Sequence, residues 1–96
     1  MSIQLDTLVP LSQTPSMPNI DTVKGVKMNI YPNDHVPPHI HAIFGEHEAL
    51  IEIITQNIFI GFLPKTQLRI AIQFVAGNMA ELLEIFYRLN PKTKLL

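Results

Sequence analysis

Residues 39–62 read H-I-H-A-I-F-G-E-H-E-A-L-I-E-I-I-T-Q-N-I-F-I-G-F, and the spacing of their apolar side chains decides the predicted fold. Apolar residues recur at every second position over much of this stretch, as expected for strands that bury one face. Gly45-Glu46 and Gln56-Asn57 interrupt the alternation and are typical of hairpin turns. The stretch therefore predicts three consecutive antiparallel strands.

The segment on the N-terminal side of this stretch adds one more strand. Val26, Met28 and Ile30 alternate with more polar neighbours, which is the same period of two. Further upstream, residues 1–16 interleave proline with Ser, Thr and Gln and have no sustained period, so we expect a flexible N-terminal tail. Residues 17–96 are then a single α+β domain that begins with a four-stranded antiparallel meander.

Two helices are predicted on the C-terminal side. From Pro64 to Gly77 apolar residues recur at spacings of three and four, and proline suits the first turn of a helix. Asn78 with Glu81 three residues later resembles a capping box, and it begins a second periodic stretch that ends before Pro91. We therefore expect an α+β fold in which the four-stranded meander is followed by two C-terminal α-helices packed on it.

Length and composition restrict the class of protein. A chain of 96 residues suffices for one domain with one modest core. It has no cysteine, so any metal site would have to use histidine and carboxylate ligands. The N-terminus lacks the pattern of a signal peptide, and no apolar run is long enough to cross a bilayer. We expect a cytoplasmic protein with no membrane partner, and a net charge of −1 argues against a strong generic nucleic-acid binder.

Three of the four histidines lie within residues 33–41, which read N-D-H-V-P-P-H-I-H. On a strand, His39 and His41 point to the same side, with Cα atoms about 7 Å apart. The rigid proline pair could fold His35 back towards them. The motif therefore predicts a cluster of three imidazoles.

A metal ion is one use for such a cluster. Glu46 or His47, in the following turn, could complete a set of nitrogen and oxygen ligands suited to a divalent transition metal such as zinc. In this interpretation the metal ligands are His35, His39, His41 and Glu46.

Acid–base catalysis is a second use, and it needs no metal. Histidine titrates near neutrality, so a pair of rings facing one cleft could act as acid and base in the cleavage of a phosphodiester in RNA. Asp34 would orient one ring, and Lys65 or Arg69 would stabilise the charged intermediate. The candidate catalytic residues are the three histidines, His35, His39 and His41. A structural interpretation also stays open, in which the motif only shapes a turn.

The predicted helices carry more apolar surface than one small sheet can cover. Ile70 and Phe74 lie off the main apolar stripe of the first helix, and Ile85 lies off that of the second. The surplus predicts a partner chain, either in a symmetric homodimer or as a small partner protein.

Several segments of the chain together resemble a known family. They are M-P-N-I, G-V-K-M-N-I-Y-P-N-D-H, P-P-H-I-H, F-G-E-H-E-A-L-I-E-I and G-F-L-P-K. From Met17 to about Leu89 the chain resembles the small bacterial proteins of domain-of-unknown-function family 4160. The resemblance implies no assigned activity. It implies a gene beside that of another small protein, in a pair of the toxin–antitoxin-like kind.

The sequence leaves three functions open. The first is one component of such a pair, which binds a small partner protein encoded nearby and acts on RNA through the histidines. The second is a metal-binding domain. The third is a plain protein-interaction module without catalysis, so whether the protein is an enzyme stays undecided.

Overall fold

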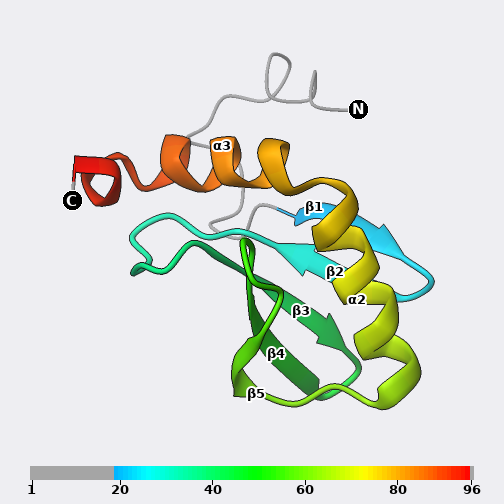
Figure 1. Cartoon of the computed structure of the whole chain (residues 1–96). Helices are drawn as coiled ribbons and strands as arrows, with labels where there is room; N and C mark the ends of the chain where they lie inside the picture. The colour runs from blue at the N-terminus through cyan, green and yellow to red at the C-terminus, as the bar shows by residue number, and fades with distance from the viewer. Residues whose placement is uncertain (1–18, 96) are drawn as a thin grey trace, which may run out of the picture.

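The computed structural model describes residues 19–95, which form an antiparallel sheet followed by two α-helices (Figure 1). The predicted tail, residues 1–16, lies outside the described residues. The elements are β1 (Asn19–Val23), β2 (Val26–Asn29), β3 (His39–Phe44), β4 (His47–Glu52), β5 (Ile58–Gly61), α2 (Lys65–Gly77), α3 (Met79–Leu89) and a 3-10 helix, η3 (Pro91–Leu95). The α+β class and the antiparallel meander are confirmed.

The sheet has five strands in the order β1-β2-β3-β4-β5, so the predicted number of four is wrong. The additional strand is β1, which pairs with β2 across the turn formed by Lys24 and Gly25. Both turn residues have positive φ, 49° and 85°, as a tight two-residue hairpin requires. Three of the five β1 residues, Asn19, Asp21 and Thr22, are polar and exposed, and Ile20 and Val23 are three positions apart, so no apolar alternation marked this strand in the sequence.

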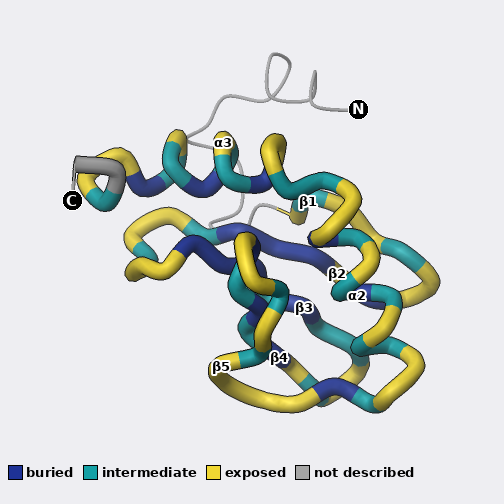
Figure 2. Tube along the Cα trace, viewed as in Figure 1, coloured by how far each residue is buried: buried dark blue, intermediate teal, exposed yellow. Residues whose placement is uncertain are grey.

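The core lies between the sheet and the helices. Alternate residues of β2, β3 and β4 are buried, and the helices add Ala71, Val75, Leu82 and Phe86, each pair spaced by four. Figure 2 shows the buried residues of α3 on the side of the helix that faces the strands. Because all of these residues join one cluster, the sheet and both helices form one packed unit.

The break between the helices lies at Gly77 and Asn78, as predicted, but the capping box is absent. The Asn78 side chain donates back to the carbonyl of Phe74 at 2.9 Å, so it does not cap the first amides of α3. The two helix axes differ by 85° at this break.

Within residues 19–95 no single helix is long and apolar enough to cross a membrane, and the bent α2–α3 pair passes that test by length and composition only.

The apolar surplus is distributed differently from the prediction. Ile70, Phe74 and Ile85 are partly buried against the core. The large apolar side chains that stay exposed in the described chain belong to the loops and β5, namely Val36, Ile54, Phe59, Ile60 and Phe62. The partner chain stays a prediction, and the exposed large apolar side chains of the described residues do not lie on the helices.

Candidate metal centre

The centre forms where the β2–β3 loop returns to the first residues of β3. Three prolines, Pro32, Pro37 and Pro38, prevent regular structure in this loop, so its path is set by side-chain contacts. Asn90, at the end of α3, accepts a hydrogen bond from the Asp34 amide at 2.6 Å and donates to the Tyr31 carbonyl at 3.0 Å. These two contacts hold the loop so that the Asp34 side chain lies over β3.

One carboxylate oxygen meets two imidazoles. Oδ2 of Asp34 lies 2.9 Å from Nε2 of His39 and 3.0 Å from Nε2 of His41. The two rings are 5.2 Å apart between centroids, as the predicted alternation on a strand requires. The three potential ligand atoms all lie within 4.8 Å of one another, so a single ion could contact all of them.

The other nitrogen of each ring is held by an oxygen. Nδ1 of His39 lies 2.8 Å from the Pro37 carbonyl, and Nδ1 of His41 lies 2.8 Å from Oε2 of Glu48. A carbonyl or a carboxylate only accepts, so each Nδ1 is assigned the proton and donates it. Nε2 of His41 also lies within hydrogen-bond distance of Asp34 Oδ2, at 3.0 Å, and it needs a proton of its own to donate there. A metal ion bound to His41 would replace that proton, whereas Nε2 of His39, once its ring carries its proton on Nδ1, has a lone pair available for a metal.

The Nε2 atom of His39 is buried and has no hydrogen-bond partner among the described residues. Asp34 Oδ2 is close enough for an ion pair, but its direction from the ring is not that of a hydrogen bond. His39 is only 2 % exposed, so water does not supply the missing contact through an open surface. A buried nitrogen left in this state is costly unless another group binds it, and a cation bound to both Nε2 and Oδ2 would do so.

The electrostatics of the cluster favour an ionised Asp34. Burial of this carboxyl acts to raise its pKa. The hydrogen bond from His41, the hydrogen bond from the His35 amide and the charges of His39 and His41 outweigh burial, and the pKa falls below the ordinary value of 3.8. An ionised carboxylate at this position is ready to bind a cation.

The structure does not bring all of the predicted ligands together. The His35 side chain is exposed, and this residue contributes its backbone amide, which donates to Oδ1 of Asp34 at 3.0 Å. Glu46 is exposed in the β3–β4 turn, and the ring of His47 packs edge-on against Phe62. Asp34, predicted only to orient a ring, takes the ligand position instead.

The predicted basic residues lie elsewhere in the fold. Lys65 and Arg69 are exposed near the beginning of α2. Figure 1 shows the beginning of α2 at the end of the molecule away from the β2–β3 loop. The geometry therefore gives neither residue a contact with the His–Asp cluster.

Four residues of the site were missed in the sequence. Glu48 could have been found, because the β3–β4 register places His41 opposite Leu50 and Glu48 two residues further along the same face. Tyr31 and Phe59 pack their rings edge-on against His41 and His39, at 4.4 Å and 5.2 Å. These contacts, like that of Asn90, depend on the tertiary fold and have no local signal.

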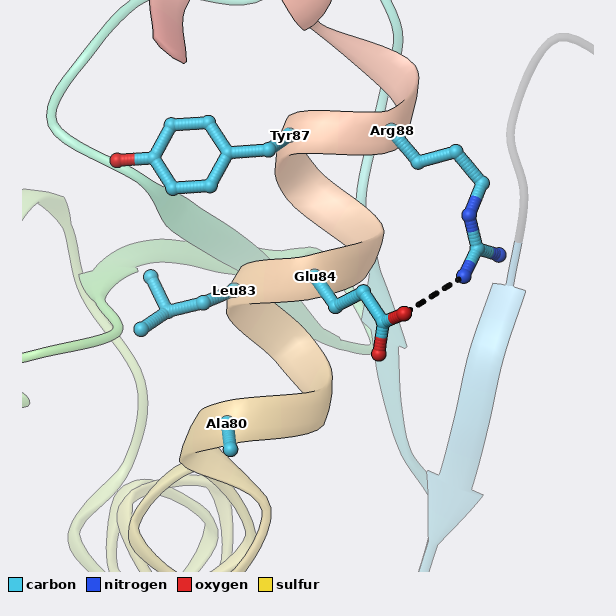
Figure 3. Close-up of a pocket in the computed structure, with 5 residues that line it drawn as sticks. All are labelled: Ala80, Leu83, Glu84, Tyr87 and Arg88. Carbon is cyan, nitrogen blue, oxygen red and sulfur yellow. Dashed lines mark ion pairs between the residues drawn. The ribbon is translucent and has the colours of Figure 1, made fainter.

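A separate hollow lies along the outer side of α3 (Figure 3). It is lined by Ala80, Leu83, Glu84, Tyr87 and Arg88, and Glu84 forms an ion pair of 3.6 Å with Arg88. Both charged residues are well exposed, so this pair adds little stability. The hollow shares no residue with the His–Asp cluster.

Fold and site together define a small α+β domain with a two-histidine, one-carboxylate cluster beside its sheet. The chain belongs to the family described as Domain of unknown function (DUF4160), whose model matches residues 25–86. The match includes Asp34, His39, His41 and Glu48 and ends before Asn90. No curated protein and no solved structure matches the chain.

Proposed function

We propose that this protein is a metal-binding domain in which Asp34, His39 and His41 hold one divalent transition-metal ion, with zinc as the preferred ion. The observation that carries the proposal is the buried Nε2 of His39, which faces Asp34 Oδ2 without a hydrogen bond. Two histidines and one carboxylate are a common ligand set for zinc and for non-haem iron.

The distances between the ligand atoms support a small ion. Two tetrahedral zinc ligands at 2.0–2.1 Å are about 3.3 Å apart, and Oδ2 lies 2.9 Å and 3.0 Å from the two nitrogens. A retreat of the Asp34 carboxylate by a few tenths of an ångström would bring both Oδ2–Nε2 distances to this value. Asp34 comes from a loop, so it is the ligand best able to move, whereas both histidines are on β3.

The groups around the ligands support the same function. Pro37 and Glu48 accept from the two Nδ1 atoms and thereby orient the rings, and the Glu48 carboxylate adds negative charge to a site with one anionic ligand. Three protein ligands leave a fourth position open, and a metal ion there would supply Lewis-acid chemistry and an acidic bound water.

Zinc titration followed by calorimetry and native mass spectrometry tests this function. We expect one ion per chain, a large loss of affinity in His39→Ala and in Asp34→Asn, and little change in His35→Ala. The last variant is the matched control, because His35 is exposed and belongs to the same motif. A wild-type chain that takes up no stoichiometric zinc, iron, manganese or nickel contradicts the proposal, as does an equal loss in His35→Ala.

Acid–base cleavage of RNA is the second candidate function of the same residues. In this function the protein would be one component of a toxin–antitoxin-like pair. The contact of one carboxylate with both rings supports it, since such a group can orient a catalytic imidazole. The burial of His39 and the distant position of Lys65 and Arg69 argue against it. Cleavage of RNA that persists in the presence of a chelator and is lost in His41→Ala would favour this function over metal binding.

A further inference from the structure

An apolar surface is exposed around the last strand of the sheet. Ile54, Phe59, Ile60 and Phe62 are 53 %, 43 %, 57 % and 62 % exposed, and we call these four residues the β5 patch. β5 is an edge strand, since the sheet ends with it. Figure 2 shows exposed residues along β5 and the segment that follows it. Residues 53–63 carry no charged side chain at all.

The opposite edge of the sheet is protected in the usual way. Strand β1 and its turn expose Asp21, Thr22 and Lys24, and charged or polar residues of this kind discourage another strand from pairing. Both edges contain a register shift, so a bulge does not distinguish them. The difference between the two edges is chemical, and only the β5 edge has the composition of an interface.

Two residues of the β5 patch, Phe59 and Ile60, belong to β5 itself, and Phe62 follows the strand directly. Gly61 has a φ of 88°, and a Cβ at this position would collide with the carbonyl of Glu48. The Phe62 amide donates to the same carbonyl at 2.9 Å. Phe59 rests its ring against His39, and Phe62 rests against His47. Because these contacts fix the aromatic rings before any partner arrives, binding would lose little conformational entropy.

We infer that the β5 patch is the surface on which two copies of this chain pair about a two-fold axis. An uncharged patch offers no charge complementarity to an acidic or basic partner, and it meets no repulsion from an identical copy. In an isologous contact the same strand faces itself, so Ile60 and Phe62 of one copy meet the apolar residues of the other.

The size of the patch agrees with a dimer contact. Four large side chains exposed to this extent present roughly 400–500 Å² of apolar surface, which is about the apolar share of a standard interface of some 800 Å² per partner. The largest apolar patch on a typical monomer measures about 300–600 Å², and patches of this size are often functional. The inference does not depend on metal binding.

Sedimentation velocity on the full chain tests the interface. We expect the wild type to sediment at twice the chain mass of 10.9 kDa. Ile60→Lys and Phe62→Lys, each placing two like charges at the two-fold contact, should raise the dimer dissociation constant about 100-fold or more and yield folded monomers. Thr22→Lys, an exposed substitution on the opposite edge, is the matched control and should remain dimeric. Circular dichroism checks that each variant is folded.

Two results would overturn the inference. A wild type that stays monomeric at high concentration means that no second copy covers the patch. A dimer that persists in both lysine variants but dissociates in Leu83→Lys, on the outer side of α3, places the interface on the helix. If the patch is instead covered by another protein, the isolated wild type stays monomeric, and the inference of a homodimer is overturned in the same way.

Discussion

The side-chain oxygen of Asn90 accepts a hydrogen bond of 2.6 Å from the backbone amide of Asp34, although 56 residues separate the two. The Asn90 amide group also donates to the carbonyls of Tyr31 and Phe86, both at 3.0 Å. Asn90 is only 5 % exposed, so these bonds form in a nearly dry environment. One side chain at the end of α3 therefore sets the position of the loop that carries the Asp34 carboxylate.

Replacement of Asn90 should weaken both the fold and the metal site. Asn90→Ala leaves the Asp34 amide and the Tyr31 carbonyl without their partner, and we expect the free energy of unfolding to fall by about 1–3 kcal/mol. Zinc affinity should fall about 10–100-fold, as is typical when a group that positions a ligand is removed. Urea unfolding and zinc titration measure the two effects. Gln73→Ala, exposed on α2, is the control and should change neither; equal behaviour of the two variants would contradict the assigned role.

Acid should weaken the protein through Asp34. The pKa of Asp34 is lower in the folded state than in the unfolded chain. The ionised carboxylate therefore contributes its full stabilisation at a pH above the unfolded-state pKa of about 3.8. This stabilisation is lost as the pH falls through the lower folded-state pKa. We expect the difference in unfolding free energy between the wild type and Asp34→Asn to be constant near neutral pH and to shrink below about pH 4. Because His39 and His41 are coupled to Asp34, the difference reports the carboxylate together with its contacts to the two rings. A difference that grows on acidification would show the opposite sign and refute the assignment.

Glu48 and Glu46 should behave differently although they are neighbours. Glu48→Gln weakens the acceptor that holds Nδ1 of His41, so we expect zinc affinity to fall about 10-fold or more. Glu46→Gln removes the same charge in the exposed β3–β4 turn, two residues before Glu48, and should leave the zinc affinity unchanged. Calorimetric zinc titration of the two variants separates ring orientation from net charge. A comparable loss in both would mean that general charge, and not the contact with His41, is responsible.

Two glycine substitutions should have opposite outcomes. Gly61→Ala places a Cβ against the Glu48 carbonyl at a φ of 88°, and we expect a loss of at least about 1–3 kcal/mol in unfolding free energy. Gly77→Ala, in the last turn of α2, has no atom within 4 Å of the new Cβ and should be neutral or stabilising by up to about 1 kcal/mol. Thermal unfolding followed by circular dichroism compares them. An unchanged melting temperature in Gly61→Ala would contradict the close β4–β5 approach described above.

Local sequence patterns were sufficient for most of the fold. Apolar residues recur with a period of two over β2, β3, β4 and β5, and with a period of three to four over both helices. Both periods arise because each element buries one face, so each element can be predicted from its own residues. The same alternation was enough to place His39 and His41 side by side, because both belong to one strand.

Only the tertiary structure decided which groups join the two histidines. His35 is near them in the sequence, but the loop directs its side chain to solvent and brings Asp34 in, because Asn90 holds the Asp34 amide from the far end of α3. Glu48 comes from the neighbouring strand, and Phe59 from the strand beyond it. β1 was missed for a related reason, since an edge strand need not bury a face and is defined by its pairing with β2. Contacts between residues distant in the chain leave no periodic trace, so the packing of the elements, and not the pattern within any of them, determines the composition of the site.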